Sequence, residues 1–193
     1  MGKIENSKDL ILLLLYARGS EGKFCEPVSG QTRLMKMIFL FKKELYQQFK
    51  HGTIAETAFP DFEAYDYGPY SAQVYEDLEF LVNVGMVEVV EDGNTAVSEE
   101  EKGEFEYWSV TRADDLAGTP LGRTFKLTSM GKQFVEQELL KGRNEISADQ
   151  LAIIAEFKAR CVRATLRSLL QYVYSKYGDM TTKSKIRDQI LNG

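Results

Sequence analysis

Several residue types that build active sites are scarce in this sequence. Its 193 residues include one histidine, His51, and two cysteines, Cys25 and Cys161. No Cys, Asp or Glu stands beside the histidine at a ligand-like spacing, so we expect no metal site. The cysteines lie far apart, which argues against a disulfide framework and favours a reducing, cytoplasmic compartment.

Long apolar runs are also missing. The longest, at residues 10–17, is too short to span a bilayer, so no membrane contact is expected. Glu5 and Asp9 flank this run and Arg18 follows it, a poor context for a secretory signal. We therefore expect a first helix that is apolar on every side and lies in the core.

Motifs for catalysis are absent as well. The sequence has no Gly-rich phosphate loop, no nucleophile elbow and no histidine near a Ser or Cys. We expect a protein that is not an enzyme, with no catalytic residue and no cofactor. A pair among its 29 acidic residues is the one enzymatic alternative.

Charge is distributed unevenly along the chain. Residues 54–117 contain 17 acidic and 2 basic residues, a net charge of −15, and no Lys or Arg lies between Phe59 and Glu101. Residues 1–53 have a net charge of +4, from 9 basic and 5 acidic residues, and residues 156–193 have +5, from 8 and 3. An acidic middle between basic ends limits the partners that the middle can bind.

The hydrophobic spacing predicts an α+β, mainly helical protein. Ser7, Ser71 and Ser147 stand in helix-capping positions, and Gly68-Pro69 is expected to form a turn. Loops are expected at residues 19–30 and 95–104. Helices are expected over residues 7–18, 32–49, 72–84, 130–141, 148–177 (as one helix or two) and 182–191, and extended segments at 62–67, 86–91, 105–110 and 123–127.

This order of elements is typical of a winged helix-turn-helix, here with an enlarged wing and extra C-terminal helices. Residues 72–84 take the place of the recognition helix, and the wing covers about residues 86–128. We expect a winged-helix domain over residues 1–142 and a helical extension over residues 143–193. The extension either forms a homodimer or packs on its own chain through its apolar residues: Leu151, Ile154, Phe157, Leu166, Leu169, Leu170 and Val173.

Two stretches resemble the Panacea antitoxin domain and related bacterial and archaeal winged-helix proteins, over roughly residues 7–90. Leu-Met-Lys-Met-Ile-Phe at residues 34–39 is similar to the family's Leu-x-Lys-Leu-x-Tyr segment. Residues 62–69, followed by Val74 and Tyr75, resemble its Glu-Ala-Trp-x-x-Gly-Pro-Val…Val-Tyr signature, with Tyr65 in place of Trp and Tyr70 in place of Val. The matching positions are Lys36, Glu63, Tyr65, Tyr67, Gly68, Pro69 and Tyr75.

The resemblance implies a small cytoplasmic protein that acts by binding a protein partner, such as a toxin, without catalysis. An acidic helix and wing would suit a basic partner, and neighbouring aromatic residues would supply anchors. These tyrosines have a structural alternative, because aromatic residues also pack at core edges. The expected partner-binding residues are Tyr65, Tyr67, Tyr70, Gln73, Glu76, Asp77 and Glu79.

The alternative function is a winged-helix transcription regulator that binds DNA. The expected carboxylates on residues 72–84 oppose it, since contacts between cations and phosphates supply most of the affinity for DNA. A basic surface would then have to form elsewhere. Its expected members are Arg33, Lys36, Lys43, Arg163 and Arg167, together with lysines such as Lys158.

Overall fold

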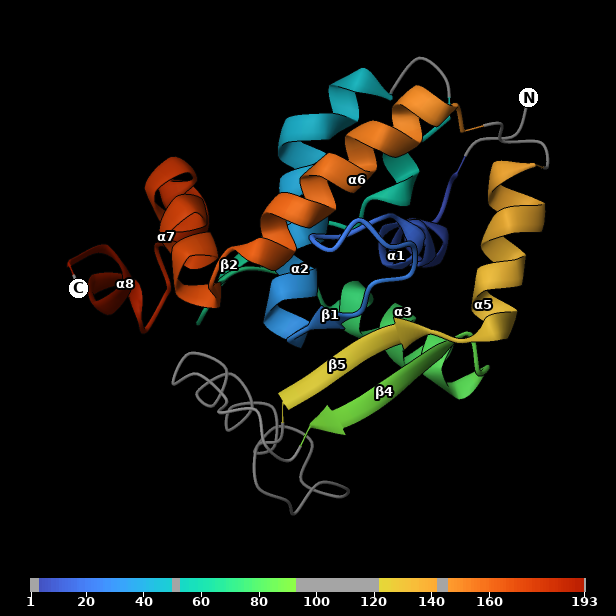
Figure 1. Ribbon diagram of the computed structural model, residues 1–193. Helices are drawn as coiled ribbons and strands as arrows, with labels where there is room; N and C mark the ends of the chain where they lie inside the picture. Colours follow the sequence, from blue (N-terminus) through green and yellow to red (C-terminus); the bar gives the residue numbers. More distant parts are fainter. Residues whose placement is uncertain (1–3, 50–52, 93–121, 142–145, 193) are drawn as a thin grey trace.

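A computed structural model describes residues 4–49, 53–92, 122–141 and 146–192 (Figure 1). The fold is α+β and mostly helical, with two small antiparallel sheets, which confirms the predicted class at that level. The elements in chain order are α1 (Ser7–Tyr16), β1 (Val28–Ser29), α2 (Gln31–Leu40), β2 (Glu63–Tyr65), β3 (Gly68–Tyr70), α3 (Ala72–Asn83), β4 (Val87–Asp92), β5 (Gly122–Leu127), α5 (Ser129–Phe134), α6 (Ala148–Arg163), α7 (Leu166–Lys176) and α8 (Arg187–Asn192).

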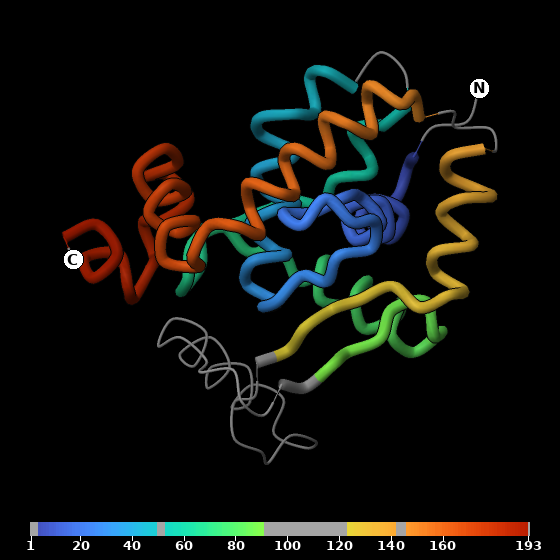
Figure 2. The backbone as a smooth tube through the Cα atoms, viewed as in Figure 1, coloured from blue at the N-terminus to red at the C-terminus, as the bar shows by residue number. Residues whose placement is uncertain are grey.

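Helix α1 is the centre of the hydrophobic core. Every residue from 10 to 17 is buried, as expected for a helix that is apolar on every side. Figure 2 shows α1 in the middle of the molecule, with α6, β5 and the continuation of α5 around it. The predicted cap was off by one residue, since the Asn6 side chain accepts the backbone N–H of Asp9 and Ser7 is the first helical residue.

Helix α2 continues as a π-helix, Phe41–Leu45, and ends in a 3-10 turn, Tyr46–Gln48. Together they cover the single helix predicted at residues 32–49. All residues from 34 to 41 are buried, and the Phe41 ring lies 5.7 Å from that of Phe157 in α6. Glu44, within this π-helix, accepts a hydrogen bond from the Tyr172 hydroxyl of α7 at 2.8 Å.

Strands β2 and β3 form an antiparallel hairpin where the sequence predicted one extended segment. The prediction that Gly68-Pro69 makes the turn is wrong. Asp66 and Tyr67 form the turn, and the Gly-Pro pair begins β3. Gly68 has a φ of +84°, a conformation that residues with a side chain rarely adopt.

Helix α3 follows the hairpin and matches the prediction for residues 72–84. Ser71 occupies its N-cap position but makes no side-chain cap hydrogen bond. Its inner face buries Val74, Leu78 and Leu81 against the core. Gly85, with a φ of +74°, then reverses the chain into β4.

The larger sheet has the strand order β1-β5-β4. Strands β4 and β5 are antiparallel, with Val87 opposite Leu127. Strand β1 was predicted to be loop; it pairs Val28 with Phe125, and both side chains are buried. Two residues are too few to show a period of two, so the pattern did not reveal it. The predicted strand at residues 105–110 and the loop before it lie outside the described residues.

The start of α5 is fixed to the end of α3. The Thr128 hydroxyl donates to the Gly85 carbonyl oxygen at 2.7 Å and accepts the Gly131 N–H at 3.1 Å. A Cβ at Gly131 would lie only 2.2 Å from the carbonyl oxygen of Met86, so a side chain does not fit there. Helix α5 then continues as a π-helix, Val135–Leu140.

The C-terminal helices pack on the rest of their own chain. Ser147 and Gln150 form the predicted capping box of α6, and Thr165 caps α7, so the predicted stretch is two helices. A 3-10 turn, Gly178–Thr181, leads to α8. The apolar residues that were expected to form either a dimer interface or contacts with their own chain therefore pack within the chain. Those fully buried are Ile154, Phe157, Leu166, Leu169, Leu170 and Val173, and Leu151 is half-buried.

Candidate functional site

The two stretches that resemble the Panacea domain meet at one buried corner. Lys36, on α2, is 1% exposed, and its Nζ donates to the carbonyl oxygen of Pro69 at 3.0 Å. A buried ammonium must find acceptors because losing water is costly. The expectation that Lys36 belongs to a basic surface for DNA is therefore wrong.

Helix α7 closes the same corner from the other side. A Cβ at Gly68 would lie 2.8 Å from Cε1 of Tyr174, so the glycine gives room for a buried tyrosine ring. The Tyr174 hydroxyl is 2.8 Å from Oγ of Ser184. Gly68 and Pro69 thus hold the hairpin in a fixed position between α2 and α7.

Three tyrosines form an aromatic strip across the hairpin and α3. The rings of Tyr65 and Tyr70 are stacked, with centroids 4.9 Å apart, and those of Tyr70 and Tyr75 are 5.7 Å apart. All three side chains are half-buried. Each such ring pair contributes about 1 kcal/mol beyond the area it buries, so the strip is preorganised.

The outer face of α3 is acidic. Gln73, Glu76 and Glu79 are exposed on it, as predicted. The prediction that Asp77 is exposed is wrong: the residue is 5% exposed, and its carboxylate accepts a hydrogen bond from the Ser7 hydroxyl and lies 2.7 Å from the Lys8 ammonium. Asp77 falls on the helix face that packs against α1, so it joins two helices.

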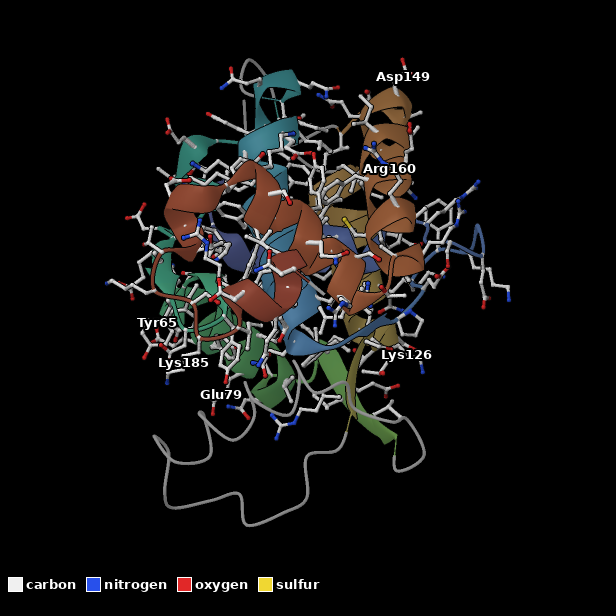
Figure 3. The ribbon with its side chains drawn as sticks, turned by 90° about the vertical axis from the view of Figure 1, so that its left-hand side faces the viewer. Tyr65, Glu79, Lys126, Asp149, Arg160 and Lys185 are labelled. Atoms are coloured by element: carbon white, nitrogen blue, oxygen red, sulfur yellow. The ribbon has the colours of Figure 1, made fainter. Side chains whose placement is uncertain are left out.

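The hairpin turn is occupied by the C-terminal segment. Nζ of Lys185 lies 2.6 Å from the Asp66 carboxylate, and its backbone N–H donates to the Asp66 carbonyl oxygen at 2.9 Å. Figure 3 shows Tyr65, Lys185 and Glu79 on one face of the molecule, far from Asp149. Glu63 is exposed and Tyr67 is half-buried beside this turn. No local pattern could have predicted the pairing of segments so far apart in the chain.

The residues expected to form a basic surface are divided between the interior and the outside. Arg33 is half-buried, and its Nη1 donates to the carbonyl oxygens of Cys161 and Ala164 at 2.5 and 2.6 Å, closing the C-terminal end of α6. With Lys36 buried, the exposed members are Lys43, Arg163 and Arg167. Nη2 of Arg167 donates to the Gln189 carbonyl oxygen at 2.9 Å.

Lys158 is a buried cation that the sequence pattern placed on the surface. It is 0% exposed, and its Nζ donates to three carbonyl oxygens, those of Leu15 (2.8 Å), Ala17 (2.9 Å) and Glu26 (2.6 Å). Burial lowers the pKa of this ammonium to about 8. Its three protons match three acceptors, so it ties α6 to the end of α1 as a structural group.

Glu44 forms a second polar cluster, on the π-helix. Its Oε1 accepts from the hydroxyls of Tyr172 (2.8 Å) and Tyr177 (2.9 Å) and from the Lys176 ammonium (3.0 Å). Burial raises the pKa of Glu44, but the three donors outweigh it and leave the pKa below its ordinary value of 4.5. The cluster fastens α7 to the end of α2.

Within the described ranges, no group of three or more His, Cys, Asp or Glu side chains is placed to hold a metal ion. In the same part of the chain, no helix has both the length and the apolar character needed to cross a bilayer. Comparisons with protein-family models, curated proteins and solved structures found no match.

Proposed function

We propose that this protein is a non-enzymatic interaction module of antitoxin or adaptor type that binds a basic partner protein. The observation that carries the proposal is the charge on the outer face of α3. Glu76 and Glu79 are exposed there, and neither α3 nor the hairpin before it contains a Lys or Arg. Such a face attracts a cationic surface and speeds its association.

The aromatic strip supports the same proposal. Tyr65 and Tyr70 are stacked beside the acidic face, and aromatic residues are common anchors of protein interfaces. Because Gly68 and Pro69 hold the hairpin on both sides, these rings lose little freedom on binding.

The proposed architecture is a winged helix, in which α1, α2 and α3 are followed by the hairpin of β4 and β5. The order of the elements supports it. The contact between Lys36 and Pro69 joins the two stretches that resemble the Panacea domain. A basic toxin is the partner class that this resemblance implies. The proposed compartment is the cytoplasm, where the free thiols of Cys25 and Cys161 would stay reduced.

The alternative is a DNA-binding regulator with α3 as its recognition helix. The order of elements favours it, but the charge on α3 opposes it, since carboxylates repel phosphates at close range. Burial of Lys36 and the contacts of Arg33 with carbonyl oxygens also reduce the basic surface that such a regulator would use.

The test is affinity purification from the native cell with the full chain as bait, with and without nuclease. We expect a basic protein at near-equal stoichiometry that resists nuclease and is lost from the Glu76→Lys/Glu79→Lys bait. The control bait is Asp149→Lys/Glu156→Lys, which makes the same charge change on exposed positions of α6. Recovery of specific DNA without a protein would overturn the proposal.

A further inference from the structure

The outer face of α3 carries exposed apolar residues as well as carboxylates. Phe80 is 49% exposed and Val84 is 39% exposed, one helical turn apart. Met130, at the start of α5, is 47% exposed, and its Cε lies 3.4 Å from the place of a Cβ on Gly85. Because Gly85 directly follows Val84, we treat Phe80, Val84 and Met130 as one anchor patch.

The anchor patch lies next to the acidic positions of α3. Glu76 is one turn before Phe80, and Glu79 is its neighbour in sequence. The Phe80 ring already has a cation over it, since Nζ of Lys8 lies 5.4 Å from the ring centroid. Exposed apolar side chains are commonly functional when polar residues border them, and this patch is bordered by the carboxylates of Glu76 and Glu79 as well as by the Lys8 ammonium.

We infer that the anchor patch, with Glu76 and Glu79, is the docking surface for a basic amphipathic helix of a partner protein. This inference rests on the proposed function and specifies the chemistry of the partner. Apolar side chains of such a helix would cover Phe80, Val84 and Met130. Its Lys or Arg residues would face the two glutamates, in the manner of a helix bound to a complementary surface.

Two other occupants fit the surface less well. A second copy of this chain that paired α3 with α3 about a twofold axis would place the same glutamates against each other. A DNA backbone would meet the same carboxylates and gain nothing from the apolar side chains. Helix α3 has 12 residues and is about 18 Å long, a length that a helix of about 12 to 15 residues can cover.

The experiment compares two synthetic Leu/Lys peptides of about 15 residues and identical composition. In one, the leucines fall on a single helical face; in the other, they are spread around the helix. Binding to the full chain is measured by fluorescence anisotropy at low salt. We expect the amphipathic peptide to bind roughly tenfold more tightly than the permuted one.

The Phe80→Ser variant should lose this preference while it still binds both peptides weakly through charge. Val84→Ser and Met130→Ser should weaken it in part. Leu191→Ser is the matched control, because Leu191 is 40% exposed on α8, and it should leave the preference intact. Unchanged thermal unfolding of the four variants, all at exposed positions, would exclude misfolding.

The outcomes separate the inference from the proposed function. Equal affinity for the two peptides in the unaltered chain would overturn the amphipathic helix and leave an acidic binding surface. Absence of binding by both peptides, at low salt, would count against the acidic face itself and so against the proposed function. Self-association that Phe80→Ser abolishes would assign the patch to a second copy and overturn the inference.

Discussion

The corner under the hairpin and the outer face of α3 are opposite in character, since the first is buried and the second is exposed. At the corner, Lys36 is buried and donates to the Pro69 carbonyl oxygen, and Gly68 lies against the Tyr174 ring. On α3, Glu76 and Phe80 are exposed. The comparison indicates that Lys36 and Gly68, at positions that resemble the Panacea domain, fix the hairpin, whereas the exposed residues of the neighbouring helix α3 form a surface for a partner. Substitutions at Gly68, Lys36, Asp77 and Glu76 test this division, and one at Glu44 tests the separate cluster on the π-helix.

The largest effect is expected from Gly68→Ala. The left-handed backbone and the contact with the Tyr174 ring both oppose a side chain, so the free energy of unfolding should fall by about 3 kcal/mol. Gly22→Ala is the control, because Gly22 has a similar φ of +73° and no neighbour within 4 Å. It should cost only about 1 kcal/mol in urea denaturation. Equal losses would mean that the Tyr174 contact contributes nothing.

Lys36→Met should lower the free energy of unfolding by about 2 kcal/mol, because the Pro69 carbonyl oxygen loses a buried donor. Lys43→Met changes an exposed lysine on the same helical segment and should stay within about 0.5 kcal/mol. Chemical denaturation midpoints at constant slope measure both. If the two variants were equally stable, Lys36 would not hold the corner.

Asp77 and Glu76 test the division within one helix. Asp77→Ala should destabilise the fold by about 1.5 kcal/mol, because the Ser7 hydroxyl and the Lys8 ammonium lose their acceptor. Glu76→Ala should change the thermal midpoint little and weaken binding of a basic probe instead. A variant of Glu76 that lost stability without losing binding would contradict the division.

Glu44→Gln should give the smallest and most pH-dependent effect, about 1 kcal/mol of unfolding free energy at pH 7. The pKa of Glu44 is lowered in the folded state, so its contribution is present above about pH 4.5. This contribution is lost as the pH falls through the pKa of Glu44 in the folded state. The unfolding free energies of the unaltered chain and of Glu44→Gln should then become equal. Glu138→Gln, at an exposed position, is the control and should show no such convergence. A constant difference down to pH 2.5 would exclude the carboxylate as the cause.

Much of the secondary structure could be predicted from local pattern. Three examples are the apolar run of α1, the capping box at Ser147 and the helix-ending Gly85. Each of these signals is contained within a few consecutive residues. Strand β1 and the turn at Asp66 were missed because they depend on pairing with distant strands or on one glycine dihedral angle. Local periodicity contains neither kind of information.

The candidate site was less predictable than the fold. The helical period predicted the exposure of Glu76 and Glu79. It did not predict the burial of Asp77, which depends on contacts with Ser7 and Lys8 of another helix. Lys36 and Lys158 look like surface lysines in sequence. Both are buried. The Lys36 ammonium donates to the Pro69 carbonyl oxygen, and the Lys158 ammonium donates to three carbonyl oxygens of other segments.

The contact between Lys158 and α1 has a consequence for synthesis of the chain. The ammonium meets the Leu15 carbonyl oxygen across 143 sequence positions, so α6 is made long after α1. At about 5 to 20 residues per second, a ribosome needs roughly 7 to 30 seconds to cover that distance. During this interval α1, whose residues 10–17 are all buried in the finished fold, lacks its contact with α6.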